Sequence, residues 1–351
     1  MRSRWIALVL GLAFAQLLLA KHKREQPPKP LPLPPQLPMA LAAQTRSLEF
    51  RISPLLAKGG LDAQIGKSLN DLIHQTRGER IIKLRAFVSG AGDARMVSQK
   101  ASRIFTQHKL PLPVVSIVQV GALGGGAAEV VIEAVVESRQ VFNPNGLAFF
   151  SGQRAPSFQQ SVERLSRSVR AVSVPAGNVL TCTCFVPSLA NAASLRATLG
   201  QAFPASLIAL VQPLRQPDNN ETMCEAAARL SAPPRNGPVE VLKHPRVSLV
   251  NSPQLIFTGL QLSFGAYLED AHEAFARLRR DASAVQPVQG PVSMNIFALD
   301  PYAASALLRE ATAPRAIFTV RTVEGLPAID ASAGIEAVFA AKPAAPASVG
   351  R

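Results

Sequence analysis

The side chains best suited to bind a metal or act as a nucleophile are few and scattered. The three cysteines are Cys182, Cys184 and Cys224, and the Cys-x-Cys pair lies in an apolar run without metal-ligand spacing. We expect all three to be core residues rather than a disulfide framework. The five histidines lie in different segments, without an HExxH motif or a paired spacing. The sequence therefore predicts no metal site and no cofactor.

A glutamate followed by an alanine recurs in three apolar segments, at Glu133, Glu225 and Glu336. A carboxylate costs free energy to bury unless it is hydrogen-bonded, so its recurrence at one place in three segments suggests a fixed partner. The other interpretation is that each glutamate faces solvent on an edge strand. The residues alone leave both interpretations open.

The elements that position these glutamates recur three times in the order strand, amphipathic helix, strand, helix, strand, strand. The first set is expected at residues 47–52, 61–75, 81–89, 93–107, 114–123 and 129–137. The second is expected at residues 146–151, 158–172, 179–186, 191–202, 206–214 and 222–230. The third is expected at residues 247–251 with 254–258, 267–284, 292–299, 301–310, 315–323 and 334–340. Phe87, Phe185 and Phe297 each end the strand before the second helix and keep the three sets in register.

Composition agrees with folded domains. The chain has 351 residues, of which 48% are hydrophobic and 17% charged, which excludes a disordered polymer. The formal net charge of +14 is spread among acidic residues, with no run of more than two consecutive Lys or Arg after Arg24. Basic and aromatic residues do not alternate as they do where bases stack. We therefore interpret the charge as a solvated basic surface and predict no nucleic-acid partner.

The first 45 residues have the pattern of a targeting segment followed by a spacer. Residues 6–20 (IALVLGLAFAQLLLA) are apolar apart from Gln16 and follow two arginines, as in a signal peptide. The basic residues 21–24 favour an uncleaved membrane anchor instead, and a mis-set start codon is the third alternative. Residues 21–45 form a basic, proline-rich linker. The protein is accordingly expected to be exported (periplasmic or extracellular) or anchored to a membrane, and cytoplasmic if the start is mis-set.

Three sets of short motifs resemble one known family. The run PVVSIVQVGAL at 113–123, closing with VIEAV at 131–135, resembles the end of the reactive-intermediate deaminase (Rid, YjgF-type) domain, formerly named endoribonuclease L-PSP. The opening strand of that domain resembles GLAFFSGQ at 146–153. The third set offers FTG at 257–259, PR at 314–315 and IEA at 335–337. The resemblance places Rid-like repeats at residues 46–138, 139–234 and 238–341, before a disordered tail at 342–351.

The resemblance implies an α+β fold of three chorismate-mutase-like or ferredoxin-like domains, each a mixed sheet with two helices. Family members are homotrimers with a central barrel and ligand clefts between neighbours. Three copies in one chain therefore imply a single-chain pseudo-trimer that is a monomer in solution. The family hydrolyses enamines or imines derived from amino acids, so the implied ligand is a small carboxylate or a keto or imino acid.

The family clamps its substrate carboxylate with an arginine, because a planar guanidinium holds a carboxylate by two hydrogen bonds. The resemblance places this arginine at Val115, Ser206 and Arg315, so Arg315 is the one candidate, unless it is a strand-end arginine that faces solvent. The glutamate that positions water falls on Val131, Met223 and Gly334, which leaves the catalytic residue unknown.

Ser151, Gly152 and Gln153 match the family's Ser-Gly-Gln, and a strand-end hydroxyl with free backbone amides can hold an anionic or carbonyl oxygen. The alternative is a simple turn.

Two functions follow from these assignments. One is an enamine or imine deaminase homologue with at most one surviving carboxylate-binding cleft, and the other is a non-catalytic small-ligand-binding or scaffold protein of the same fold. Ribonuclease activity has little support, because the chain lacks a histidine pair for acid and base catalysis.

Overall fold

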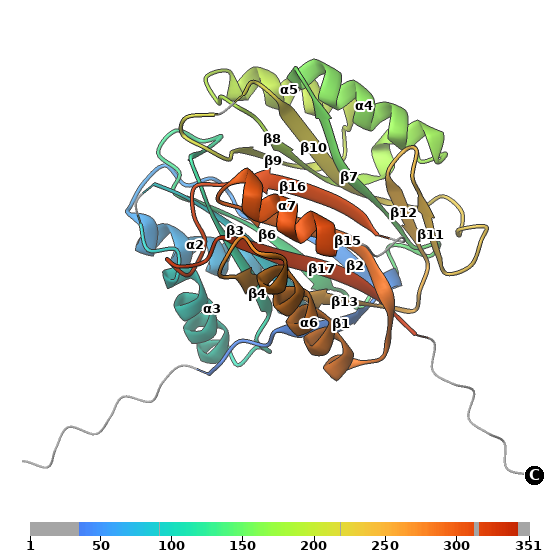
Figure 1. Cartoon of the computed structure of the whole chain (residues 1–351), viewed down its shortest axis with the longest axis horizontal. Coiled ribbons are helices and arrows are strands. Elements are labelled where there is room, and N and C mark those ends of the chain that lie inside the picture. The colour runs from blue at the N-terminus through green and yellow to red at the C-terminus, as the bar shows by residue number, and fades with distance from the viewer. Residues whose placement is uncertain (1–34, 91, 218, 312–315, 343–351) are drawn as a thin grey trace, which may run out of the picture. The chain divides into compact units, whose positions relative to one another are not determined.

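The computed structural model describes residues 35–342, apart from residues 91, 218 and 312–315 (Figure 1). The expected signal or anchor segment, most of the expected linker, Arg315 and almost all of the expected tail lie outside the described residues. No helix in the described part is long and apolar enough to cross a membrane.

Helices and strands follow the predicted order in three consecutive units. Unit 1 contains β2 (Leu48–Ile52), α2 (Leu61–Gln75), β3 (Arg80–Ser89), α3 (Met96–Gln107), β4 (Val114–Val120) and β6 (Val130–Glu137). Unit 2 contains β7 (Leu147–Ala155), α4 (Phe158–Ala171), β8 (Val179–Phe185), α5 (Ala192–Ala202), β9 (Leu207–Gln212) and β10 (Thr222–Arg229). Unit 3 contains β13 (Gln254–Thr258), α6 (Leu268–Val285), β15 (Val288–Ala298), α7 (Pro301–Glu310), β16 (Ile317–Thr322) and β17 (Ala333–Ala341). The structure is thus a mixed α/β arrangement of the α+β class.

The three units share one strand order. The sheets contain the runs β2-β6-β3-β4, β7-β10-β8-β9 and β13-β17-β15-β16. In each run the unit's last strand lies between its first and second strands and is antiparallel to both. The second and third strands are parallel, and α3, α5 or α7 connects them. The strand carrying each recurrent glutamate is therefore an interior strand.

Short additional strands extend two of these sheets. β1 (Ala40–Gln44) pairs with β13, although residues 40–44 fall within the predicted linker, so the ordered fold begins before residue 45. β11 (Val239–Leu242) pairs with β12 (Val247–Val250), and β12 pairs with β7. β12 therefore extends the sheet of unit 2, whereas the sequence assigned it to the third repeat.

Strand pairing also joins unit 1 to unit 2, because β5 (Ala122–Leu123) pairs with β9. A short strand of unit 3, β14 (Gln261–Ser263), pairs with β17. The described strands nevertheless form three separate sheets of six, seven and four strands. The predicted central barrel is therefore wrong as a closed ring of hydrogen-bonded strands.

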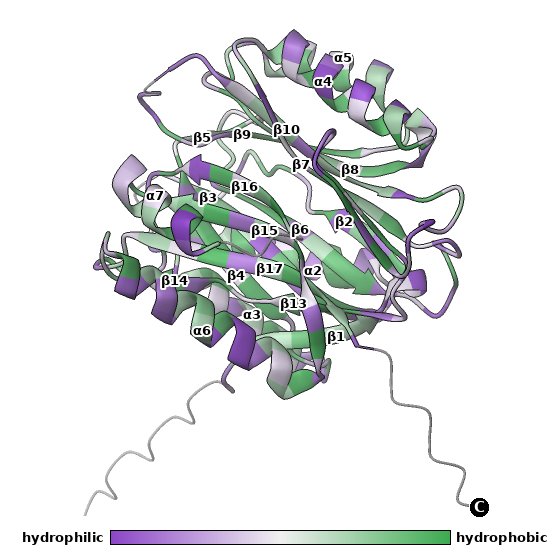
Figure 2. Ribbon diagram, turned by 45° about the vertical axis from the view of Figure 1, so that its right-hand side comes forward, coloured by the Kyte–Doolittle hydropathy of each residue, from purple (hydrophilic) through white to green (hydrophobic). Residues whose placement is uncertain are grey.

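Each pair of helices covers one face of its own sheet. The spacing of Leu61, Ile65, Leu69 and Leu72 makes α2 amphipathic, and all four side chains are buried against strands of unit 1. Helices α4 and α5 pack in the same way on unit 2, and α6 and α7 on unit 3. In Figure 2 the helices show both hydrophilic and hydrophobic stretches, whereas most of the strands are hydrophobic. The opposite faces of the three sheets contact one another, and the candidate site lies there.

Candidate functional site

The three recurrent glutamates converge between the sheets. Strand register places Glu133 opposite Arg85, Glu225 opposite Thr183 and Glu336 opposite Asn295. Each glutamate thus lies beside the second strand of its own unit, at the same level. Because residues directly opposite one another in a sheet share a face, these side chains project into one interior space.

Arg85 connects all three carboxylates. Its Nε and Nη2 atoms each lie 2.6 Å from Oε2 of Glu133, and Nη1 lies 2.9 Å from Oε1 of Glu225 and 3.5 Å from Oε1 of Glu336. Lys83 Nζ donates to Oε2 of Glu336 and to the carbonyl oxygen of Thr258, both at 2.6 Å. The structure therefore supports the interpretation of buried glutamates with a fixed partner, and solvent exposure on an edge strand is wrong.

Arg321 of β16 completes this charged cluster. Its Nη2 lies 3.1 Å from Oε2 of Glu225, and its guanidinium lies 3.5 Å from the ring centroid of Phe185. The side chain is only 3% exposed, and its Nε and Nη1 atoms have no hydrogen-bond partner among the described residues. Three buried cations, Lys83, Arg85 and Arg321, thus match three carboxylates.

Burial and charge act against each other on the pKa values in the cluster. Burial would raise the pKa of Glu336, but the charges of Lys83 and Arg85 outweigh it and lower that pKa to about 2. Burial lowers the pKa of Lys83, and the carboxylate of Glu336 offsets only part of this shift. For Arg321, burial lowers the pKa to about 10 despite Glu225. Surrounding carboxylates outweigh burial at Arg85 and raise its pKa.

Phenylalanine layers enclose the charged level on both sides along the strands. Two residues beyond Arg85, Thr183 and Asn295 lie the landmark residues Phe87, Phe185 and Phe297, which share one buried cluster. On the other side of the charged level, a second hydrophobic cluster contains Phe50, Phe149 and Phe257, one from the first strand of each unit. The sequence landmarks that marked the repeats therefore meet in space.

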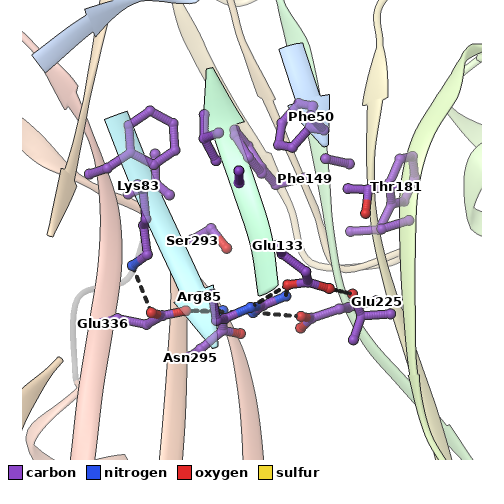
Figure 3. A pocket seen from close by; sticks show the side chains of 18 of the residues that line it. Phe50, Lys83, Arg85, Glu133, Phe149, Thr181, Glu225, Ser293, Asn295 and Glu336 are labelled. Atoms are coloured by element: carbon purple, nitrogen blue, oxygen red, sulfur yellow. Dashed lines mark hydrogen bonds and ion pairs between the residues drawn. The ribbon is translucent and has the colours of Figure 1, made fainter. Parts of the chain in front are cut away.

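A cavity of about 120 Å³ lies between the charged level and the layer of Phe50, Phe149 and Phe257 (Figure 3). The three carboxylates and Arg85 form one end of it, and the phenylalanines form the other. Lys83, Thr181 and Ser293 line the wall between these ends. Strand register places them opposite Val135, Ala227 and Val338, one residue in each unit at the same level.

The sequence missed the basic half of this site, although it carried a signal for it. Lys83 and Arg85 alternate in an otherwise mainly apolar strand, so they share a face, and this strand precedes the first glutamate strand. Two cations at period two in a buried strand need carboxylate partners, and the recurrent glutamates were the available ones.

The described residues contain no cluster of side chains that could hold a metal ion.

Ser151, Gly152 and Gln153 lie within β7 rather than in a turn, so the turn alternative is wrong. The Gly152 amide donates to Oγ1 of Thr319 at 3.0 Å, which connects β7 to β16. The Ser151 hydroxyl donates to the carbonyl oxygen of Arg246, and the Gln153 side chain donates to that of Ser151. These groups already have protein partners, and none of the three residues lines the cavity at the charged level. Their role in ligand binding stays a prediction.

Arg315 lies outside the described residues, but the register of the strand after it bears on its assignment. Val115 pairs with Leu84, and the residues at the same level in units 2 and 3 are Ile208 and Phe318. The alignment from sequence had placed Ser206 and Arg315 there. Strand register therefore aligns apolar residues of units 2 and 3 with Val115, and the assignment of Arg315 to a ligand site stays a prediction.

Two clefts lie between neighbouring units, as the resemblance implies for ligand sites. Val131 and Ile208 line a cleft of about 380 Å³ together with Arg196, whose Nη1 donates to the Ile208 carbonyl oxygen. Met223 and Arg321 line another of about 130 Å³. At Gly334, a Cβ atom would lie 2.8 Å from the Leu260 side chain. The three positions expected to match the family's glutamate are thus apolar, and one of them is crowded.

The cysteines are buried, as expected, but two of them are bonded. Cys184 of β8 and Cys224 of β10 lie opposite each other and form a disulfide, and Cys182 is free and buried. Burial raises the pKa of the Cys182 thiol, so this thiol stays protonated. The expectation that all three cysteines are only core residues missed this bond.

The chain matches no protein-family model and no curated protein. It is similar to the solved structure of an uncharacterized protein from Pseudomonas aeruginosa, with 14% identity over 30% of this chain and 99% of that one and a TM-score of 0.23. A YjgF-family member from Neisseria meningitidis shares 13% identity over 33% of this chain and 94% of its own, with a TM-score of 0.22. A chorismatase covers 84% of this chain and 99% of its own at 13% identity and a TM-score of 0.24. At such TM-scores none of them carries an activity over to this chain.

Proposed function

We propose that this chain is a single-chain pseudo-trimer of three diverged Rid-like units that binds a small ligand and has lost imine hydrolysis. The three-unit part of the proposal is supported by the strand order that the sheets share. Further support comes from the equivalent positions of Glu133, Glu225 and Glu336 around one interior space.

One observation carries the loss of catalysis. The family's reaction needs an arginine to clamp the carboxylate and a glutamate to position water. The resemblance assigns the arginine position to Val115, and strand register aligns Ile208 and Phe318 with Val115. At the glutamate position the three units carry Val131, Met223 and Gly334. An apolar side chain can neither hold a carboxylate by paired hydrogen bonds nor orient a water molecule. An imine deaminase with one cleft around Arg315 is the alternative that the register disfavours.

We further propose that the protein works in an oxidising compartment, exported or held at a membrane by its N-terminal segment. The cross-strand disulfide between Cys184 and Cys224 supports this location, since disulfides persist outside the reducing cytosol.

Turnover of an imine generated in solution tests the catalytic half. An amino-acid dehydratase would supply 2-iminobutanoate, and formation of 2-oxobutanoate would be compared with and without this protein. We expect no acceleration beyond spontaneous hydrolysis. Acceleration by the wild type that Arg315→Ala abolishes, with Arg309→Ala as the matched control on α7, would overturn the proposal and restore the deaminase.

A further inference from the structure

We propose that the cavity on the common interior of the three units, lined by Lys83, Thr181 and Ser293, binds a small uncharged molecule with a hydrogen-bond acceptor and an apolar body. This inference rests on the ligand-binding part of the proposed function and assigns it a place and a ligand class. The cavity lies apart from the clefts between neighbouring units, where the family resemblance would place a ligand.

Free hydrogen-bonding capacity on the cavity wall is the first argument. The hydroxyls of Thr181 and Ser293 have no hydrogen-bond partner among the described residues, and both residues are only partly buried and line the cavity. Lys83 uses two of its three N–H donors, for Glu336 and for the Thr258 carbonyl oxygen. Three donors, one from each unit, therefore line the same space, and an acceptor atom there would take a hydrogen bond from one or two of them (Figure 3).

Charge balance selects an uncharged ligand. Every carboxylate of the cluster is paired: Glu133 with Arg85, Glu225 with Arg85 and Arg321, and Glu336 with Lys83. An anion entering this space would add a charge that no free cation matches, and desolvating it would be costly. A carbonyl oxygen accepts hydrogen bonds without that cost.

Size and shape limit the apolar part. The volume of about 120 Å³ is close to that of an engineered cavity, of roughly 150 Å³, that binds benzene. The end of the cavity away from the charges is formed by Phe50, Phe149 and Phe257, whose rings suit a compact ring or branched alkyl group. Arg51 also lines the cavity and its side chain is 38% exposed, so the cavity is not sealed from solvent.

Three probes of matched size test the ligand class: cyclopentanone, methylcyclopentane and butyrate. Saturation-transfer NMR on the full chain would measure binding, and crystals soaked with cyclopentanone would locate it. We expect cyclopentanone to bind in this cavity with its oxygen hydrogen-bonded to Thr181 or Ser293, and butyrate to bind at least tenfold more weakly. Electron density for cyclopentanone only in the clefts between units would overturn the proposal, and so would tighter binding of butyrate than of cyclopentanone. Both measurements use the wild-type protein and so do not depend on the folding of any variant.

Two variants separate the hydrogen bonds from the packing. Thr181→Val and Ser293→Ala each remove one donor with little change of volume, so each should weaken cyclopentanone by roughly twofold to tenfold, the range of a single neutral hydrogen bond. Binding of methylcyclopentane should change less than twofold. Ser305→Ala, at an exposed position of α7, is the matched control and should change neither affinity. Cyclopentanone affinity that is unchanged in both cavity variants would refute the assignment. This outcome would leave the result of the imine assay unchanged, because that assay measures hydrolysis and not binding in the cavity.

Discussion

Arg85 and Arg321 differ in how many carboxylates depend on them. Arg85 contacts Glu133, Glu225 and Glu336, whereas Arg321 contacts Glu225 alone, and Glu225 keeps Arg85 when Arg321 is removed. The positions equivalent to Arg321 in units 1 and 2 are valines, opposite Phe87 and Phe185 as Arg321 is opposite Phe297. The fold therefore accommodates an apolar side chain at this level.

We predict that Arg85→Met destabilises the protein far more than Arg321→Met. Removing the common partner of buried carboxylates costs about 3–5 kcal/mol, because their charges are left uncompensated. Arg321→Met removes one ion pair but also two buried N–H groups without acceptors, so we expect a loss under about 2 kcal/mol. Urea unfolding of both variants measures the difference. Equal losses would contradict the central position of Arg85.

Acid should destabilise the fold through Glu336. Its pKa is depressed to about 2 from an ordinary value of 4.5, so its contribution is fully present above pH 4.5 and is lost as the pH falls toward 2. The shift corresponds to an order of magnitude of about 3 kcal/mol. In Glu336→Gln the decline of unfolding free energy over this pH window should be shallower, although the variant is less stable at pH 7. Urea titrations across the window test this, and an unchanged slope would mean that other carboxylates cause the acid sensitivity.

At the scale of elements, much of the fold was predictable because the repeats carry clear periodicity. The helix at residues 61–75 was predicted at its observed bounds, and the glutamate strands were placed within a residue or two. β1 was missed because ALAAQ follows a proline-rich stretch and shows no alternation of its own. It forms because the edge of β13 is available to pair with it.

The strand before Val323 shows why sequence alone does not fix which residue of unit 3 aligns with Val115. AIFTV offers no strict alternation to fix its register, so a motif match on Pro-Arg set the alignment instead. A shift by one residue, or by any odd number, moves every side chain to the other face of a strand. Half of the charged site was predictable from sequence, because the recurrence of the glutamates identified them. Their basic partners lie in another strand or another unit, so no local sequence pattern indicates which residues pair with them.

The disulfide between β8 and β10 should stabilise unit 2. It joins residues separated by 40 positions, for which loop closure in the unfolded chain predicts about 4 kcal/mol. Replacing both Cys184 and Cys224 by alanine should lower the unfolding free energy by roughly 2–4 kcal/mol, and reduction of the wild type should have a similar effect. Cys182→Ala is the control, because it leaves the bond intact. Mass spectrometry without reductant would show the bond, and its absence from the folded protein would contradict the prediction.

Removing β1 should also be costly, whereas removing the residues before it should not. Ala40 and Ala43 of β1 are buried, and β1 pairs with β13 along its whole length. Deleting residues 1–34 should leave the melting temperature unchanged, and deleting residues 1–44 should lower it by several degrees. Differential scanning calorimetry of the two truncations distinguishes them. Equal melting temperatures would show that β1 contributes little.

At the scale of the whole molecule, the units complete one another. Lys83 of unit 1 pairs with Glu336 of unit 3, Arg85 of unit 1 with Glu225 of unit 2, and Arg321 of unit 3 with the same Glu225. Each unit taken alone would expose unpaired charges and the phenylalanines that close the interior. The three units of one chain thus neutralise one another's buried charges.

We therefore predict that the protein is a monomer in solution. Sedimentation equilibrium on the region from residue 35 should give a mass no greater than the 37.3 kDa of the full chain, at all concentrations tested. Charge pairing between units also predicts a single cooperative unfolding transition, because opening one unit exposes buried charges in the other two. Arg85→Met should broaden or split that transition, whereas Arg321→Met should leave it single. A mass near three times that of the chain would mean that the three units do not satisfy their own interfaces, and the single-chain pseudo-trimer would have to be abandoned.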